Sequence, residues 1–186
     1  MDHSIAQLKS GEVYVTGGFG LNPEHSKLYL ADSLDAPDIT LFEIDLNHTD
    51  NLATTILQDS SLDGLQDFGV LPTGEIIIAR GDSFGYVDPD ASSPSYTEIY
   101  TAQDFLDSFG SGADAEPEAV AVNPRTGQVY VFAHDILQLF VIPDVLNPSP
   151  LPTHVDPGWG SVDLHDLGVD YDGNVYGWDE GSGDMV

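Results

Sequence analysis

The fold is decided by the stretch Glu118-Ala-Val-Ala-Val-Asn-Pro124-Arg-Thr-Gly127-Gln-Val-Tyr-Val-Phe-Ala-His134. Two short runs of apolar, mostly β-branched residues stand on either side of a turn that contains Asn, Pro and Gly. Runs of this length and composition are typical of strands, and those turn residues supply the dihedral angles that a tight turn needs. The stretch therefore predicts a β-hairpin.

The same hairpin pattern recurs at three other places in the chain, over residues 18–32, 67–80 and 166–179. The second strand of each hairpin starts at Leu28, Ile76, Val129 and Val175, so the pattern returns roughly every fifty residues. A repeat of this length that is made of short strands is typical of β-propeller blades, whereas helical repeats would show a period of 3.6.

Further strand-like runs follow three of the hairpins. A third strand is expected over residues 39–44, 84–87 and 137–142, and a fourth over 53–57, 96–100 and 152–155. The sequence thus predicts an all-β, propeller-like fold of about four blades, each a four-stranded antiparallel sheet, in one domain over residues 1–186. The repeats span roughly 17–58, 66–100, 117–155 and 165–186, and residues 103–109 alone have a short helical spacing.

The last repeat is expected to be incomplete, because its third strand should begin at Asp184-Met-Val186, where the sequence ends. An unfinished blade leaves exposed strand edges. Two interpretations remain open: residues 1–16 complete the last blade and close a small ring, or the chain is part of a larger propeller.

Acidic residues dominate the composition: 32 Asp and Glu against 4 Lys and Arg give a formal charge of −28, and cysteine is absent. Such a surface repels phosphate backbones and anionic lipid, so we expect neither nucleic acid nor membrane as a partner. The expected partner is a protein or a small-molecule ligand at the propeller loops or channel. The charge suits an extracellular or cell-surface location, or the cytoplasm of a halophile.

Three segments resemble repeats of the NHL and YVTN propeller families: residues 20–45, residues 116–131 and residues 167–176. The resemblance extends to the gluconolactonase-like branch, and these families include scaffolds, surface proteins and metal-dependent lactonases. It implies a ring of blades whose first strands line a central channel. Since one fold serves many functions, the resemblance predicts architecture more strongly than activity.

Three acids, Asp67, Glu118 and Asp166, stand at the same place in repeats two, three and four, just before the first strand. In such propellers these positions project into the channel, where like charges repel unless a cation lies between them. Carboxylate oxygens favour Ca²⁺ or Mg²⁺. The alternative is that an acidic chain places acids at strand ends without a ligand.

Two other motifs have more than one interpretation. His165 precedes Asp166 and is a weak candidate for a catalytic acid or base, although an exposed or structural histidine is the simpler reading. Residues 170–174 contain half of an EF-hand loop, but Gly168 would stand at its first position. A hairpin turn is favoured there.

The sequence therefore favours a non-catalytic binding or scaffold module. The alternative is a metal-dependent hydrolase or lactonase, in which an ion held by Asp67, Glu118 and Asp166 activates water.

Overall fold

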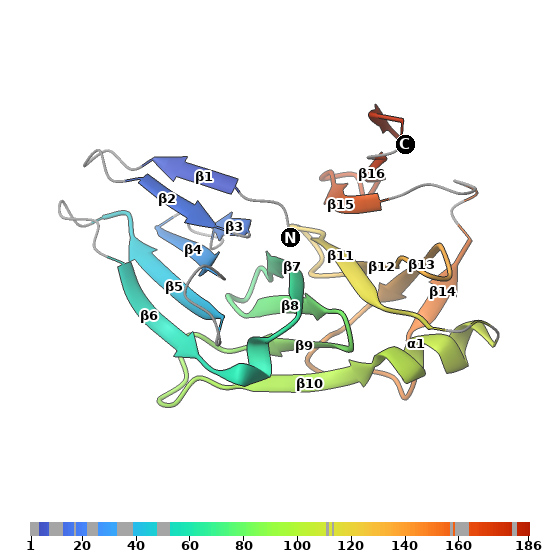
Figure 1. Ribbon diagram of the computed structural model, residues 1–186, viewed down its shortest axis with the longest axis horizontal. Coiled ribbons are helices and arrows are strands. Elements are labelled where there is room, and N and C mark those ends of the chain that lie inside the picture. Colours follow the sequence, from blue (N-terminus) through green and yellow to red (C-terminus); the bar gives the residue numbers. More distant parts are fainter. Residues whose placement is uncertain are drawn as a thin grey trace.

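The computed structural model describes residues 4–7, 13–16, 18–21, 26–32, 39–47, 53–110, 112, 114–156, 158, 164–179 and 182–186. Within these residues the chain forms short antiparallel strands and one α-helix (Figure 1). The predicted all-β, propeller-like fold is confirmed.

Four of the sheets correspond to the four repeats, and in each the strands pair in chain order. Sheet 1 contains β3 (Gly18–Leu21), β4 (Lys27–Asp32), β5 (Thr40–Asp45) and β6 (Ala53–Gln58). Sheet 2 contains β7 (Leu65–Val70), β8 (Ile76–Arg80), β9 (Ser83–Val87) and β10 (Tyr96–Thr101). Sheet 3 contains β11 (Pro117–Val122), β12 (Val129–Ala133), β13 (Gln138–Ile142) and β14 (Thr153–Val155). Sheet 4 contains β15 (Leu164–Val169), β16 (Val175–Asp179) and β17 (Asp184–Met185).

Sheet 4 has three strands, as expected for a repeat that stops where its third strand begins. Residues 1–16 do not supply a fourth strand within the described part of the chain. Instead β1 (Ser4–Gln7) pairs with β2 (Val13–Thr16), and this pair lies against β3 and β4 of sheet 1. The arc of sheets is not closed (Figure 1).

The hairpin turns are built by the residues that the sequence singled out. Gly74, Gly127 and Gly173 each adopt a positive φ, which other residues rarely tolerate. The Asp170 carboxylate accepts hydrogen bonds from the backbone N–H groups of Asp172 and Asn174, at 2.9 Å each. Its lone pairs therefore organise the turn between β15 and β16, which confirms a hairpin in place of an EF-hand loop.

Successive sheets pack face to face through apolar side chains, and their first strands β3, β7, β11 and β15 lie next to one another on the inner side of the arc (Figure 1). Ile77 and Ala79 of sheet 2 pack against Val129 and Val131 of sheet 3. The opposite face of sheet 3, which includes Phe132, packs against sheet 4. Sheets 2 and 3 thus each bury one face against the preceding sheet and the other against the next.

The predicted helix forms as α1 (Ala102–Phe109), between sheets 2 and 3 in the chain. Thr101 and Asp104 form a capping box at its start, and Gly110 ends it in the left-handed conformation. Phe105 is fully buried, and its ring packs edge to face on the Phe140 ring with the two ring centroids 4.8 Å apart. The helix therefore seals one side of the core between sheets 2 and 3.

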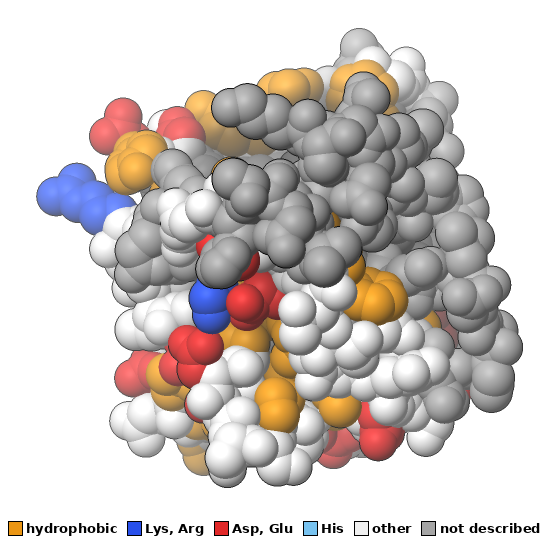
Figure 2. All heavy atoms as spheres, turned by 90° about the vertical axis from the view of Figure 1, so that its left-hand side faces the viewer, with side chains coloured by type: hydrophobic (Ala, Val, Ile, Leu, Met, Phe, Trp, Pro, Cys, Tyr) orange, Lys and Arg blue, Asp and Glu red, His pale blue; other side chains and the backbone are white. Residues whose placement is uncertain are grey.

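No helix in the described part of the chain is long and apolar enough to cross a membrane. Acidic and apolar side chains are interspersed on the described part of the surface in Figure 2. Lys27 pairs with Glu43 and Asp90 at 3.1 Å each, and Arg80 with Asp82 at 3.2 Å. With four basic residues in all, most carboxylates have no cationic partner.

Candidate functional site

The three acids predicted as ligands lie on three neighbouring first strands. Asp67 belongs to β7, Glu118 to β11 and Asp166 to β15, and β11 contacts both of the other two strands. The predicted convergence of first strands is therefore present.

The three acids do not share one register position, however. Each of these strands has a β-bulge near its start, and Asp67 and Asp166 are the first residues to pair after it. In β11 the corresponding residue is Ala119, because Glu118 is itself the bulged residue. The sequence alignment of Glu118 with Asp67 and Asp166 is thus off by one residue, since a bulge inserts a residue that periodicity cannot reveal.

Asp67 connects two sheets. Its Oδ1 accepts a hydrogen bond from the Phe68 N–H at 2.7 Å, and its Oδ2 accepts one from the Val120 N–H of sheet 3 at 2.8 Å. Burial raises the pKa of the Asp67 carboxyl to about 7; the charge of Asp166 adds to the rise, and the two N–H donors oppose it. Both carboxylate oxygens of Asp67 thus already accept a backbone hydrogen bond.

Asp166 is more exposed than Asp67 and makes the same local hydrogen bond, since its carboxylate accepts from the Leu167 N–H. Partial burial raises the pKa of the Asp166 carboxyl, and this hydrogen bond opposes the rise. The side chain of His165, the weak catalytic candidate, lies outside the described part of the structure.

Glu118 points toward the end of the neighbouring strand β12. Its Oε2 lies 3.6 Å from Nδ1 of His134, and the same nitrogen lies 3.9 Å from Oδ1 of Asp135. The backbone N–H of His134 donates to the Glu116 carbonyl at 3.2 Å. This contact holds the turn after β12 beside the segment that leads into β11.

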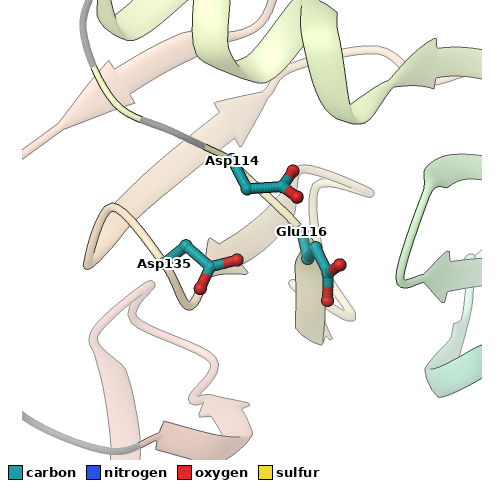
Figure 3. Close-up of side chains that lie close together, drawn as sticks. All are labelled: Asp114, Glu116 and Asp135. Carbon is teal, nitrogen blue, oxygen red and sulfur yellow. The ribbon is translucent and has the colours of Figure 1, made fainter.

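An acidic cluster forms at this end of sheet 3. Asp114 and Glu116 precede β11, Asp135 lies in the turn after β12, and the three side chains approach one another (Figure 3). One carboxylate oxygen from each lies within 4.8 Å of the others, close enough to hold one cation. All three residues are exposed. Among the described residues, Asp114, Glu116 and Asp135 are the group of potential metal ligands whose side chains come this close together.

The neighbouring acids repel the carboxylate of Glu116. Some burial raises the pKa of its carboxyl, the negative charges of Asp114, Asp135 and Glu118 raise it further, and His134 opposes the rise. A bound cation would remove this repulsion.

Sequence reasoning did not assign Asp114, Glu116 or Asp135 as ligands. A signal was present, because antiparallel pairing of β11 and β12 places the residues before the first strand beside those after the second. The Asp114-Ala-Glu116 and His134-Asp135 segments are therefore neighbours in any such hairpin.

No protein-family model and no curated protein matches this sequence. The fold is similar to several solved structures. A protein of unknown function from Bacteroides thetaiotaomicron has a TM-score of 0.61 at 14% identity, over 91% of this chain and 45% of that one. A putative gluconolactonase has a TM-score of 0.56 at 12% identity, over 96% and 59%. A calcium-binding protein, regucalcin, from Agrobacterium tumefaciens has a TM-score of 0.57 at 12% identity, over 90% and 68%.

These similarities show a propeller-like fold. Sequence identities of 12–14% support no conclusion about function. The chain spans 45% of the length of the Bacteroides thetaiotaomicron protein and 59% of the length of the putative gluconolactonase.

Proposed function

We propose that the protein is a non-catalytic β-propeller binding module that holds a divalent cation, Ca²⁺ in preference to a transition metal, at the acidic end of sheet 3. The observation that carries this proposal is the approach of Asp114, Glu116 and Asp135, whose carboxylate oxygens lie within 4.8 Å of one another.

The donor set accounts for the choice of ion. Three carboxylates offer hard oxygen ligands, which suit Ca²⁺ and Mg²⁺, and the chain has no cysteine to attract softer metals. Mg²⁺ demands a stricter octahedral arrangement at shorter distances, whereas Ca²⁺ accepts irregular sites at exposed loops. Ca²⁺ is therefore the ion that fits this cluster better.

Because the acidic cluster is exposed, an ion held there would stay accessible to a ligand. Because Ca²⁺ takes six to eight oxygen ligands, three carboxylates leave positions for water or for oxygens of a partner. A protein or small-molecule ligand that supplies a carboxylate or carbonyl would then be recognised through the ion, despite the net charge of −28. The calcium-binding neighbour from Agrobacterium tumefaciens supports the proposal only in that its fold is similar.

Calorimetric titration of metal-free protein with CaCl₂ tests the proposal. We expect one site in the wild type and at least about a tenfold weaker affinity in Asp135→Asn and in Glu116→Gln, since ligand charge sets the affinity of such sites. Asp172→Asn is the matched control, because Asp172 is an exposed acid in a distant turn. Equal affinity in all four proteins, or no heat of binding, would contradict the proposal.

The second candidate is a metal-dependent hydrolase or lactonase with an ion at Asp67, Glu118 and Asp166. The effect of the Asp166 charge on the pKa of Asp67 supports it, because the two carboxyl groups sense each other. Against it stands the use of both Asp67 oxygens as hydrogen-bond acceptors. In the same titration, loss of affinity in Asp166→Asn with none in Asp135→Asn would favour this candidate, as would calcium-dependent hydrolysis of a simple lactone.

A further inference from the structure

A hollow lies between sheets 2 and 3, and it and the acidic cluster are at opposite ends of the β11–β12 hairpin. It is formed by the β7–β8 turn, the β11–β12 turn and the loop that follows β13, and residues 71–73, 125–127 and 143–146 line it. Its volume is about 320 Å³, which is the size of a site for a small ligand. The two sheets that form it are covered by other sheets on both faces.

One wall of the hollow is apolar. Leu71 and Pro72 come from the β7–β8 turn, and Val145 and Leu146 come from the loop after β13. Leu71 and Val145 are buried in the core between sheets 2 and 3, whereas Leu146 is 46% exposed. A ligand with an aliphatic body that covers Leu146 would therefore remove apolar surface from water.

Arg125 lines the same hollow and lacks an acidic partner among the described residues. The structure describes three of the four basic residues of the chain. Lys27 and Arg80 each form an ion pair with a carboxylate, whereas the guanidinium of Arg125 forms none with any described residue. In a protein with a net charge of −28, an exposed guanidinium of this kind is a local site for an anion.

The β11–β12 turn holds its hydrogen-bond donors in a fixed place. The side chain of Asn123 is buried, and its Oδ1 accepts the backbone N–H groups of Arg125 at 2.9 Å and of Thr126 at 3.1 Å. The Gly127 N–H donates to the Asn123 carbonyl at 2.9 Å. The Thr126 hydroxyl oxygen accepts the Gln128 N–H at 3.3 Å, so its own hydrogen is available to a ligand in the hollow.

Asp144 limits the charge that the hollow accepts. It also lines the hollow, and its Oδ1 accepts the N–H groups of Leu146 and Asn147 at 3.1 Å each. Its negative charge repels a second negative charge on a ligand. With one cation and one acid in its lining, the hollow suits a single carboxylate better than a phosphate or a dicarboxylate.

We propose that this hollow binds a small monocarboxylate with an aliphatic body. The carboxylate accepts hydrogen bonds from the Arg125 guanidinium and the Thr126 hydroxyl, and the aliphatic body lies on Pro72 and Leu146. One water occupies about 30 Å³ in the liquid, so the volume of the hollow limits the ligand to about ten non-hydrogen atoms. This site is separate from the cation site at the acidic cluster and does not depend on it.

Titration of the whole chain with sodium 4-methylpentanoate at constant ionic strength, followed by ¹H–¹⁵N NMR spectra, tests this proposal. We expect saturable shifts of the amide signals of Arg125, Thr126 and Gly127, with a dissociation constant of about 1 mM, since so small a ligand makes few contacts. The neutral analogue 4-methylpentanamide should bind at least about tenfold more weakly, because it loses the charge-assisted hydrogen bonds. Acetate should also bind at least about tenfold more weakly, because it lacks the aliphatic body.

A matched pair of variants tests the cation. Arg125→Gln should raise the dissociation constant at least about tenfold and leave the fold unchanged, because the side chain is exposed. Lys27→Gln is the control, since it changes the net charge equally at a side chain that is paired with Glu43, and it should leave the dissociation constant unchanged. Asp144→Asn keeps an oxygen for the Leu146 N–H and should strengthen binding, because it removes a repelling charge.

Three results would overturn the proposal. Acetate or inorganic phosphate that binds as tightly as 4-methylpentanoate would show a general affinity for anions. Equal weakening by Arg125→Gln and Lys27→Gln would show a response to net charge alone. The absence of saturable shifts in the β11–β12 turn at tens of millimolar 4-methylpentanoate would show that the hollow binds no such ligand.

Discussion

Replacement of Asp67 by Asn should remove a large part of the pH dependence of stability. Burial raises the pKa of the Asp67 carboxyl to about 7 in the folded protein, against 3.8 for an unperturbed Asp. The folded state thus holds this proton more tightly than the unfolded state. The stabilisation from the protonated group is complete below pH 3.8 and is lost as the pH rises through 7.

The magnitude follows from the linkage relation. Each unit of pKa difference corresponds to about 1.4 kcal/mol, and the interval from pH 5 to pH 8 contains about two units below the folded pKa. The wild type should therefore lose about 2.7 kcal/mol through Asp67 alone across this interval. Asn does not ionise, so the variant should lack this loss.

Urea unfolding of both proteins at pH 5, 6, 7 and 8, at constant ionic strength, measures the effect. At pH 5 the variant should be the less stable protein, because the amide nitrogen cannot accept a hydrogen bond from Phe68 or Val120, whereas the hydroxyl oxygen of the protonated Asp67 carboxyl keeps a lone pair for one of them. The free energy of unfolding of Asp67→Asn relative to wild type should then increase toward pH 8. Asp172→Asn serves as the control. A difference between Asp67→Asn and wild type that stays constant from pH 5 to pH 8 would refute the reasoning.

Three other outcomes are expected. Phe105→Ala should lower the free energy of unfolding by about 3–5 kcal/mol in urea, because it empties a fully buried position between sheets 2 and 3; a loss below about 1 kcal/mol would mean that α1 does not seal that core. Gly69→Val should prevent folding or lower the melting temperature strongly, whereas Gly168→Val should not, since only the former meets a valine at 2.8 Å. Raising NaCl from 0.1 to 1 M should raise the melting temperature, because most carboxylates lack a cationic partner; a flat response in differential scanning calorimetry would show that the acids are too dispersed to repel.

The arrangement of strands could be predicted because it depends on local chemistry. Runs such as 129–133 favour extended backbone, and a glycine such as Gly127 fixes the turn before it. Each predicted repeat begins within one residue of the first strand of its sheet. The short helix was also predicted, since its apolar spacing and its capping residues lie within one segment.

The candidate site was harder to predict, because it depends on contacts between segments. The ligand set Asp67, Glu118 and Asp166 stays a prediction, and the bulge at Glu118 shows why equal spacing along the chain does not ensure equal positions on the strands. Asp135 meets Asp114 only because a hairpin turn returns the chain to the start of β11.

By itself, then, the sequence determined the repeat, the turns, the strands and the acidic surface, because backbone preferences and charge are properties of short segments. Only the tertiary structure decided that Asp67 links sheets 2 and 3, that Asp114, Glu116 and Asp135 form the cluster, and that Gly168 faces open space while Gly69 does not. The physical reason is that desolvation, repulsion between carboxylates and packing between sheets depend on distances across the molecule. Residues with the same place in the repeat therefore acquire different roles according to whether another sheet covers them.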